Sequence, residues 1–245
     1  LRAIRFAAKL GFTIDDSCRR AIHKLGPLLS EIPAARLFEE VLKLFHSGHA
    51  EESFAGLQEY DLLQYLFPDA VTSLQDPVTS EFVRLAMQST DDRVRIDKPV
   101  TPAFLFAALL WSPIRSQTER NLEAGMPNAV ALQKATTRLI ASQVGYVSIP
   151  KRFTTVMRDI WSLQSRFRFR SGRRAYAVLN HPKFRAAYDF LCLRANAGET
   201  PIEDCRWWTE IQEMSPEQQK NIISAQKPAP RKRRRRPKRD NGGNR

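Results

Sequence analysis

The sequence predicts an all-α protein built as a multi-helix bundle, a second helical subdomain and a disordered basic tail. Along most of the chain, apolar residues recur at i, i+3, i+4 and i+7, which is the spacing of amphipathic helices. Asp, Thr and Pro stand where these patterns begin, and Gly or Pro where they end, as at helix termini. No segment shows a convincing strand pattern, so the prediction contains no sheet.

The first helix is predicted over residues 1–10. Arg2, Arg5 and Lys9 share one face of it, and two apolar faces hold Leu1, Ile4 and Ala8 and then Ala3, Phe6 and Leu10. We expect such a helix to be mostly buried, with its basic stripe turned toward a partner. Gly11 suits the C′ position because glycine enters the left-handed conformation without a Cβ penalty. The helical spacing of apolar residues is present from the first residue, without a capping residue before it, and we expect the natural protein to continue upstream.

Five further helices are predicted in the first half of the chain, over residues 19–25, 34–45, 51–67, 78–88 and 103–111. Asp15 or Asp16 caps the first of these, and Pro33 lies in the first turn of the second. Glu39 and Lys43 form a favourable i,i+4 pair on the polar face of that second helix. The third is expected to break near residues 60–61 and to stop at Pro68.

Residues 103–111 are apolar all round, which indicates a helix in the centre of a bundle. Residues 113–127 have little apolar periodicity and are the predicted seam between two domains. We therefore divide the chain into residues 1–25, 26–112, 113–127, 128–226 and 227–245. Helices in the fourth part are predicted over 128–144 and 151–167, around 184–195 and 207–208, and from Pro216.

The charge of the chain is concentrated at its end. The net charge is +13, and residues 227–245 hold ten Lys or Arg and one Asp, which leaves only +4 for the rest. No run approaches the length of a membrane span, so we expect no membrane partner. Cys18, Cys192 and Cys205 lack a Cys-x-x-Cys spacing, which argues against a disulfide framework or a zinc site and predicts a reducing, cytoplasmic location.

The chain contains no complete catalytic set and no recognisable metal site. The four histidines form no metal-binding pattern and are interpreted as surface or capping residues. The paired acids at 15–16 and 91–92 are interpreted as caps and turns, because adjacent residues do not converge on one helix face. We predict that this chain alone is catalytically inactive, since metal-dependent transfer chemistry needs paired carboxylates around metal ions.

Arginine and phenylalanine alternate from residue 166 to 170, a pattern that can hold phosphates while bases stack on the rings. The alternative is that Phe167 completes an apolar helix stripe and the arginines are only solvated, which leaves Phe169 unexplained. Arg173 and Arg174 follow closely, and Lys151 and Arg152 begin the same predicted helix. The candidate RNA-binding set here is Lys151, Arg152, Arg166, Arg168, Phe169, Arg170, Arg173 and Arg174.

The tail from residue 227 has three prolines, no apolar face and dense like charge, so it is predicted to be disordered. Its expected use is electrostatic, through counterion release on binding a polyanion. A nuclear localisation signal is the competing interpretation. The tail adds Arg231, Lys232, Arg233, Arg234, Arg235, Arg236, Lys238 and Arg239 to the candidate RNA-binding residues.

Several stretches resemble bacterial poly(A) polymerases and the related tRNA CCA-adding enzymes. Leu-Arg-Ala-Ile-Arg-Phe at the start is similar to the family's neck helix, which follows a Glu-Asp-Pro-x-Arg motif. Residues 31–40 resemble the family's Asp-Ile-Pro-Ala-Ala-Arg-Leu-Phe-Glu-Glu, with one conservative change. Residues 102–108, 149–152 and 181–189 and the arginine-rich end resemble the poly(A) polymerase branch. The family's catalytic head, with its metal-binding Asp-x-Asp, would lie entirely upstream.

The resemblance implies that the whole enzyme adds AMP from ATP to RNA 3′ ends, using Mg²⁺ held by head-domain aspartates. ATP and Mg²⁺ are thus expected in the full-length enzyme and not on this chain alone. It also implies that Arg2 and Arg5 contact the incoming nucleotide, although a solvated basic face is the alternative. RNA 3′ ends are the implied partner, together with an RNA helicase or degradosome components.

Two other functions stay open at this point. One is a CCA-adding enzyme, although the chain has the arginine-rich tail of the poly(A) branch and no His-Asp domain. The other is a free-standing helical RNA-binding protein without enzymatic activity. An upstream, in-frame Asp-x-Asp head would support the transferase.

Overall fold

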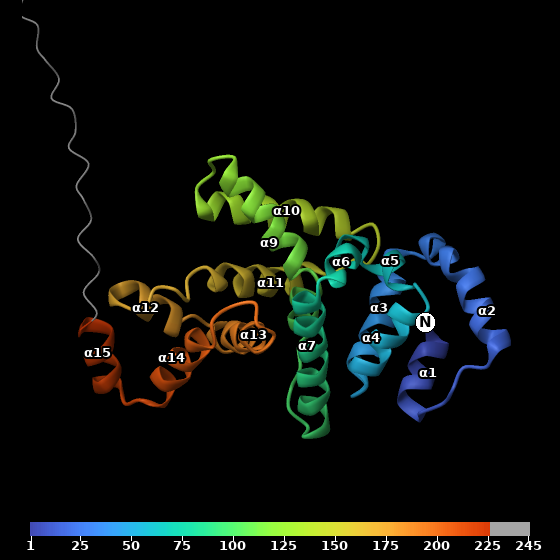
Figure 1. The fold of residues 1–245 in the computed structure, drawn as a ribbon, viewed down its shortest axis with the longest axis horizontal. Coiled ribbons are helices and arrows are strands. Elements are labelled where there is room, and N and C mark those ends of the chain that lie inside the picture. The colour runs from blue at the N-terminus through green and yellow to red at the C-terminus, as the bar shows by residue number, and fades with distance from the viewer. Residues whose placement is uncertain (226–245) are drawn as a thin grey trace, which may run out of the picture.

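The computed structural model describes residues 1–225, which form fifteen α-helices, two short 3₁₀ helices and no strand (Figure 1). This confirms the all-α class. The elements of the first half are α1 (Arg2–Leu10), α2 (Asp16–Leu25), η1 (Gly26–Glu31), α3 (Ala34–Phe45), α4 (Ala50–Glu59), α5 (Leu63–Leu66), α6 (Pro68–Val71), η2 (Thr72–Gln75), α7 (Pro77–Arg95) and α8 (Pro102–Leu109). Those of the second half are α9 (Trp111–Glu123), α10 (Asn128–Gln143), α11 (Lys151–Gln164), α12 (Gly172–Leu179), α13 (Phe184–Asn196), α14 (Ile202–Glu213) and α15 (Pro216–Ala225).

These helices form an elongated body with α1 and α2 at one end and α14 and α15 at the other (Figure 1). The long helix α7 stands across the middle, and the hairpin of α9 and α10 projects on one side. Helix α11 packs against α8 and α13 and so links the two ends. Within residues 1–225, no helix is both long and apolar enough to cross a bilayer.

Helix α1 is held mainly through one side chain. Ile4 is its only buried residue, and it lies so close to α4 that a Cβ on Gly56 would come within 2.8 Å of it. Phe6 and Leu10 are about half exposed, and Phe12 beyond the helix more so. The prediction of a mostly buried first helix is therefore wrong, because α1 packs on α3 and α4 from one side only. Gly11 has φ of 64°, which confirms the predicted glycine C-cap.

The following helices match the prediction in outline and differ in detail. Asp15 caps α2 by accepting hydrogen bonds from the backbone of Ser17 and Cys18, as predicted. Lys43 pairs with Glu40 at 3.0 Å instead of with Glu39. The predicted break at residues 60–61 is confirmed, with Asp61 at φ of 54°. The predicted stop at Pro68 is confirmed as well, because α5 ends at Leu66, and Pro68 then begins α6.

Asp91 was predicted to be a cap or turn residue, and it caps a helix distant in sequence. It lies within α7 and is 1% exposed. Its carboxylate accepts hydrogen bonds from the backbone N–H groups of Ala50 at 2.7 Å and Glu51 at 3.0 Å, at the start of α4. Burial raises the pKa of Asp91, and these two donors oppose that rise. The carboxylate thereby fixes α4 against α7.

The larger core surrounds α8, whose residues 105–109 are all buried, as the apolar segment predicted. Trp161 of α11 donates a hydrogen bond from Nε1 to the carbonyl oxygen of Ala107 at 3.1 Å. The low-periodicity segment after it is mostly helix α9, which packs along α10. Buried Asn121 donates to the carbonyl oxygen of Ala131 at 3.0 Å, so polar contacts replace the missing apolar stripe. The division into domains stays a prediction.

A second, smaller core joins α11, α12, α13, α14 and α15. Phe167, Phe184 and Trp208 pack together with ring centroids 5.3–6.1 Å apart. Trp208 also donates from Nε1 to the carbonyl oxygen of Phe167 at 3.0 Å. This core fixes the start of the segment that leads from α11 to α12, a helix that the sequence did not predict.

Cys192 and Cys205 form a disulfide that joins α13 to α14. The prediction of no disulfide is therefore wrong for this pair. The two cysteines lie on consecutive helices that pack against each other, and only this packing brings them together. Cys18 is free and exposed.

Candidate nucleic-acid interface

The linker of residues 165–171, between α11 and α12, carries several of the predicted RNA-binding residues. Phe167 is 2% exposed and points into the second core, whereas Phe169 is half-buried at the surface. Gly172 has φ of 61°, a conformation that other residues rarely adopt, and it turns the chain into α12. Because Phe167 anchors the linker, the neighbouring arginines are displayed at fixed positions.

Phe169 lies between two guanidinium groups. The Cζ atom of Arg168 is 4.9 Å from the centre of its ring, and that of Arg174 is 4.7 Å away. These are cation–π distances, so the three side chains support one another. Arg168 and Arg174 are exposed and Phe169 is half-buried, so all three side chains reach the surface.

Four arginines of this region, which we call the linker arginines, have no acidic partner among the residues that the structure describes. They are Arg166, Arg168, Arg173 and Arg174, and within residues 1–225 none of them forms an ion pair. Guanidinium groups without an internal counter-charge keep their hydrogen-bond donors free for phosphate oxygens.

Arg170 differs from the linker arginines although it stands in the same motif. It pairs with Asp204 of α14 and lies over the ring of Trp207, with Cζ 5.7 Å from the centroid. Its charge is therefore neutralised by a carboxylate of the protein itself. The arrangement ties the linker to α14.

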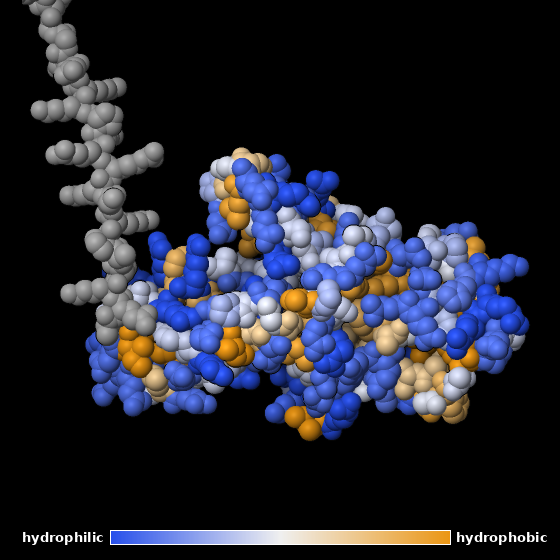
Figure 2. Space-filling view, in the orientation of Figure 1, coloured by the Kyte–Doolittle hydropathy of each residue, from blue (hydrophilic) through white to orange (hydrophobic). Residues whose placement is uncertain are grey.

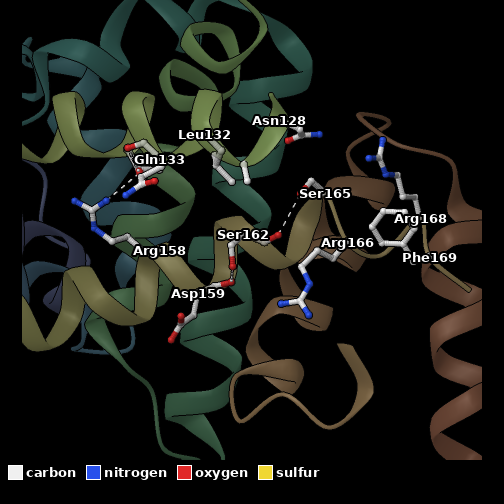
Figure 3. A pocket seen from close by; sticks show the side chains of 12 residues that line it. Asn128, Leu132, Gln133, Arg158, Asp159, Ser162, Ser165, Arg166, Arg168 and Phe169 are labelled. Carbon is white, nitrogen blue, oxygen red and sulfur yellow. Dashed lines mark hydrogen bonds between the residues drawn. The ribbon is translucent and has the colours of Figure 1, made fainter. Parts of the chain in front are cut away.

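A cavity of about 520 Å³, which we call the α10–α11 pocket, adjoins the linker (Figure 3). Leu132 and Gln133 of α10 line one side, Ser162 of α11 the other, and Phe169 closes one end. The remaining lining residues are Asn128, Ala129, Thr136, Arg158, Asp159, Ser165, Arg166 and Arg168.

Arg158 connects the two walls of this pocket. Its Nη1 atom donates to the hydroxyl oxygens of Thr136 at 3.0 Å and Thr137 at 3.2 Å, both on α10. These acceptors are neutral, so the positive charge of Arg158 is not cancelled. The contact holds α10 and α11 at a fixed separation.

Lys151 and Arg152 are not brought to the linker. They begin α11, and Arg166 follows its other end, about 20 Å away at 1.5 Å per residue. Both are exposed, and the Cζ atom of Arg152 lies 4.8 Å from the ring centre of Phe153. They can only extend the surface along the helix.

Arg2 and Arg5 lie on α1, at the far end of the molecule from the linker (Figure 1). Arg2 is exposed and 4.0 Å from the carboxylate of Glu40. Arg5 is half-buried, with Cζ 5.2 Å from the ring centre of Phe6. The pKa of Glu40 is lowered by the hydrogen bond from Lys43, and the charges of Arg2 and Arg5 add to this. The two arginines therefore face a carboxylate as well as solvent.

The basic residues of the tail, from Arg231 to Arg239, lie outside the described residues. Within residues 1–225, no group of three or more His, Cys, Asp or Glu side chains could hold a metal ion.

The α10–α11 pocket is not predicted by the sequence analysis. Arg158, Ser162 and Arg166 recur at intervals of four and form a polar stripe along α11, which could have been noticed. Asn128 and Gln133 of α10 carry no such signal, because their partner helix is identified only by the fold.

Comparison with known families gives two matches. A model described as the arginine-rich C-terminus of polymerase A matches residues 124–240. A model described as the probable RNA and SrmB-binding site of polymerase A matches residues 11–73. The linker and the pocket both fall within the first match.

Individual relatives agree with these matches. Poly(A) polymerase I of Salmonella typhi is 41% identical over 246 residues, which cover 97% of this chain and 53% of the relative. Poly(A) polymerase I of Haemophilus influenzae is 39% identical over 249 residues, which cover 98% of this chain and 55% of the relative. A CCA-adding enzyme of Lactiplantibacillus plantarum is 38% identical over 66 residues, only 27% of this chain. The chain thus spans about half the length of the poly(A) polymerases that it matches.

Proposed function

Because the chain belongs to the bacterial poly(A) polymerase family, we propose that it is the RNA-holding part of an enzyme that adds AMP from ATP to RNA 3′ ends. Such an enzyme acts in RNA processing and decay. In this proposal ATP and Mg²⁺ are used by the catalytic head of the whole enzyme, and the described residues hold RNA.

The observation that carries the proposal is the set of four linker arginines, which have no acidic partner within residues 1–225 and two of which, Arg168 and Arg174, lie over the ring of a surface phenylalanine. Single-stranded nucleic acids are bound by cationic grooves that follow the backbone and by aromatic rings on which bases stack. The linker offers both within seven residues. Lys151 and Arg152 extend the surface along α11, and Arg170 fixes the linker to α14.

The ends of the chain have separate roles in this proposal. Arg2 and Arg5 contact the incoming nucleotide in the whole enzyme, where a guanidinium can fork onto phosphate oxygens. The tail residues from Arg231 to Arg239 add sequence-independent attraction to the RNA backbone.

We further propose that residues 11–73 carry a surface for a protein partner. The family description of this region names SrmB, and an RNA helicase or a degradosome component would be such a partner. Three exposed apolar side chains support a docking surface here: Phe12, Leu25 and Leu28.

The proposed location is the cytoplasm, where ATP and RNA are present together. Disulfides are rare in that compartment, so Cys192 and Cys205 would stand there mostly as thiols.

Binding of labelled single-stranded RNA by the whole chain over a range of salt concentrations tests the proposal. We expect the chain to bind RNA and, with ATP and Mg²⁺ added, not to extend it. Removing the residues after Gln226 deletes the nine basic residues from Lys227 to Arg239 and Arg245. If about six of the charges contact phosphates, the slope of log K against log salt flattens by roughly 4 units, at about 0.7 per contact.

A chain that binds no RNA even at low salt would contradict the proposal. If the truncated chain binds RNA with an unchanged salt slope, the tail does not contact RNA, and the linker remains as the proposed RNA site.

A further inference from the structure

The α10–α11 pocket has the size and lining of a site for a small, flat, polar ligand. Its volume of about 520 Å³ lies within the range of about 300–1,000 Å³ of small-ligand sites. Ala129 and Leu132 give it an apolar wall on α10. Phe169 supplies an aromatic ring at the end next to the linker, as Figure 3 shows.

Cationic groups stand around this cavity. Arg158 lies at the end away from the linker, and Arg166 and Arg168 at the end near it (Figure 3). Within residues 1–225 none of the three forms an ion pair. A ligand in the pocket would therefore meet positive charge on both sides, which suits a nucleotide that continues into a phosphate backbone in two directions.

Polar groups inside the pocket have free hydrogen-bonding capacity. For the side-chain amides of Asn128 and Gln133 and the carboxylate of Asp159, the structure gives no hydrogen bond within residues 1–225. Amide side chains bond the edges of bases, and a carboxylate accepts from an amino group. The hydroxyls of Ser162 and Ser165, by contrast, donate to the carbonyl oxygens of Asp159 and Ser162.

We propose that the α10–α11 pocket binds one unstacked base of single-stranded RNA and prefers a base with an exocyclic amine to uracil. The base lies against α11 at the open side of the pocket, and its flanking phosphates contact Arg158 on one side and Arg166 and Arg168 on the other. Asp159, whose side chain points away from α10 (Figure 3), accepts a hydrogen bond from the amine. Uracil has no exocyclic amine; it presents two carbonyl oxygens, which a carboxylate repels, and its ring N3–H as the one donor between them. The proposal rests on the proposed RNA-binding function.

A polynucleotide is a better occupant than a free nucleotide because the cationic track continues beyond the pocket. Arg168 leads to Arg174 through the ring of Phe169, and Arg173 lies beside it on α12. One mononucleotide would leave these guanidinium groups unused.

Filling the pocket tests the proposal in the whole chain. Ala129 lines the cavity and is exposed, so Ala129→Trp blocks the site without entering the core. Ala141→Trp is the matched control, since Ala141 is exposed on the same helix and does not line the cavity. We expect Ala129→Trp to weaken binding of oligo(A) roughly five- to thirtyfold, the size of one lost base contact, and the control to change it less than about twofold. The salt slope stays unchanged in both, because no charge is removed.

The base preference is tested by Asp159→Asn. An amide can donate to the carbonyl oxygens of uracil, which a carboxylate cannot. We expect the ratio of oligo(A) to oligo(U) affinity to fall by about fivefold or more relative to the parent chain. Removing a negative charge raises the affinity for both RNAs alike, so this general effect cancels in the ratio of the two affinities.

Equal effects of Ala129→Trp and Ala141→Trp would overturn the pocket proposal. If the parent chain still binds RNA with a steep salt slope in that case, the proposed function stands and only the pocket is wrong. Competition by AMP that Ala129→Trp abolishes, without any effect of this variant on RNA affinity, would assign the pocket to a free nucleotide and also overturn the proposal. Unchanged thermal unfolding of both tryptophan variants shows that they fold.

Discussion

Two clusters of arginines show how the same side chain serves structure in one place and is available for binding in another. Arg194 of α13 is 12% exposed and donates from Nε to Glu199 at 2.9 Å and from Nη1 to Gln164 at 3.0 Å. Glu199 is 4% exposed and also accepts from Nε1 of Trp111 at 2.8 Å. The linker arginines lie at the surface and, within residues 1–225, have no carboxylate partner.

The difference lies in what neutralises the charge. Burial lowers the pKa of Arg194, and the charge of Glu199 opposes this effect. Glu199 also lies 3.5 Å from Nη1 of Arg115, and we call these three residues the closed unit. The Cζ atom of Arg194 also lies 4.7 Å from the ring centre of Trp111. At the linker the counter-charge must come from outside the described residues. An arginine count alone therefore does not separate arginines that are neutralised inside the protein from arginines that are available to a ligand.

The largest effect is expected on removing the carboxylate of the buried cluster. Glu199→Ala should lower the free energy of unfolding by about 3–5 kcal/mol, because it leaves Arg194 buried without a counter-charge. Urea unfolding at neutral pH measures this. Glu203→Ala on the exposed face of α14 is the control, expected within about 0.5 kcal/mol of the parent. Equal stability of the two variants would show that the cluster is not a closed unit.

The second-largest change in the free energy of unfolding is expected on removing the disulfide. Cys192 and Cys205 are 13 residues apart, and closing a loop of this length stabilises a fold by about 3 kcal/mol in the chain-entropy model. The double change of both to Ser should lower the free energy of unfolding by that amount when the parent is kept oxidised. The salt slope of RNA binding should not change, because α14 holds Arg170 and not the linker arginines. Cys18→Ser is the control, and a double variant as stable as the oxidised parent would rule the disulfide out.

His46, a half-buried basic residue with no acidic partner within residues 1–225, extends the comparison of arginines to a histidine. Burial lowers the pKa of His46 below its ordinary value, although its hydrogen bond to the carbonyl oxygen of Leu42 opposes this. The unfolded chain therefore takes up a proton near pH 6.5 that the folded chain refuses, so stability should fall as the pH drops below about 6.5.

Urea unfolding at pH 7.5 and pH 5.5 measures this smallest effect. His46→Leu should lose less stability between the two pH values than the parent, and His23→Leu at the surface should behave like the parent. An identical pH dependence in all three proteins would contradict the assignment to His46.

Much of the fold could be predicted from the sequence because local rules decide it. The cap at Asp15, the break at residues 60–61 and the buried α8 follow from turn chemistry and apolar spacing. The cap that Asp91 gives to α4 could not be predicted, because the two N–H groups that donate to Asp91 are about forty residues away in sequence. The disulfide escaped prediction for the same reason, since tertiary packing alone pairs the two helices.

The candidate site was predicted by its composition and not by its geometry. Alternation of Arg and Phe pointed to residues 166–170, and Phe169 is indeed at the surface while Phe167 is buried. The sequence could not show that Arg170 is paired with Asp204 and Arg168 is not. That distinction depends on where α14 packs. The roles of Arg2, Arg5, Lys151 and Arg152 stay predictions.

The central claim is that arginines without partners bind RNA and paired arginines do not. The most direct measurement compares the salt dependence of RNA binding in two triple variants with the same loss of charge. One replaces Arg166, Arg168 and Arg174 by Gln. The other replaces Arg84, Arg95 and Arg185, which pair with Glu81, Asp92 and Asp189 on the surface.

At about 0.7 per phosphate contact on single strands, we expect the first variant to flatten the slope of log K against log salt by roughly 2 units. The second should leave the slope nearly unchanged. Equal flattening in both variants would mean that only net charge matters, and would contradict the claim that the linker is the RNA site.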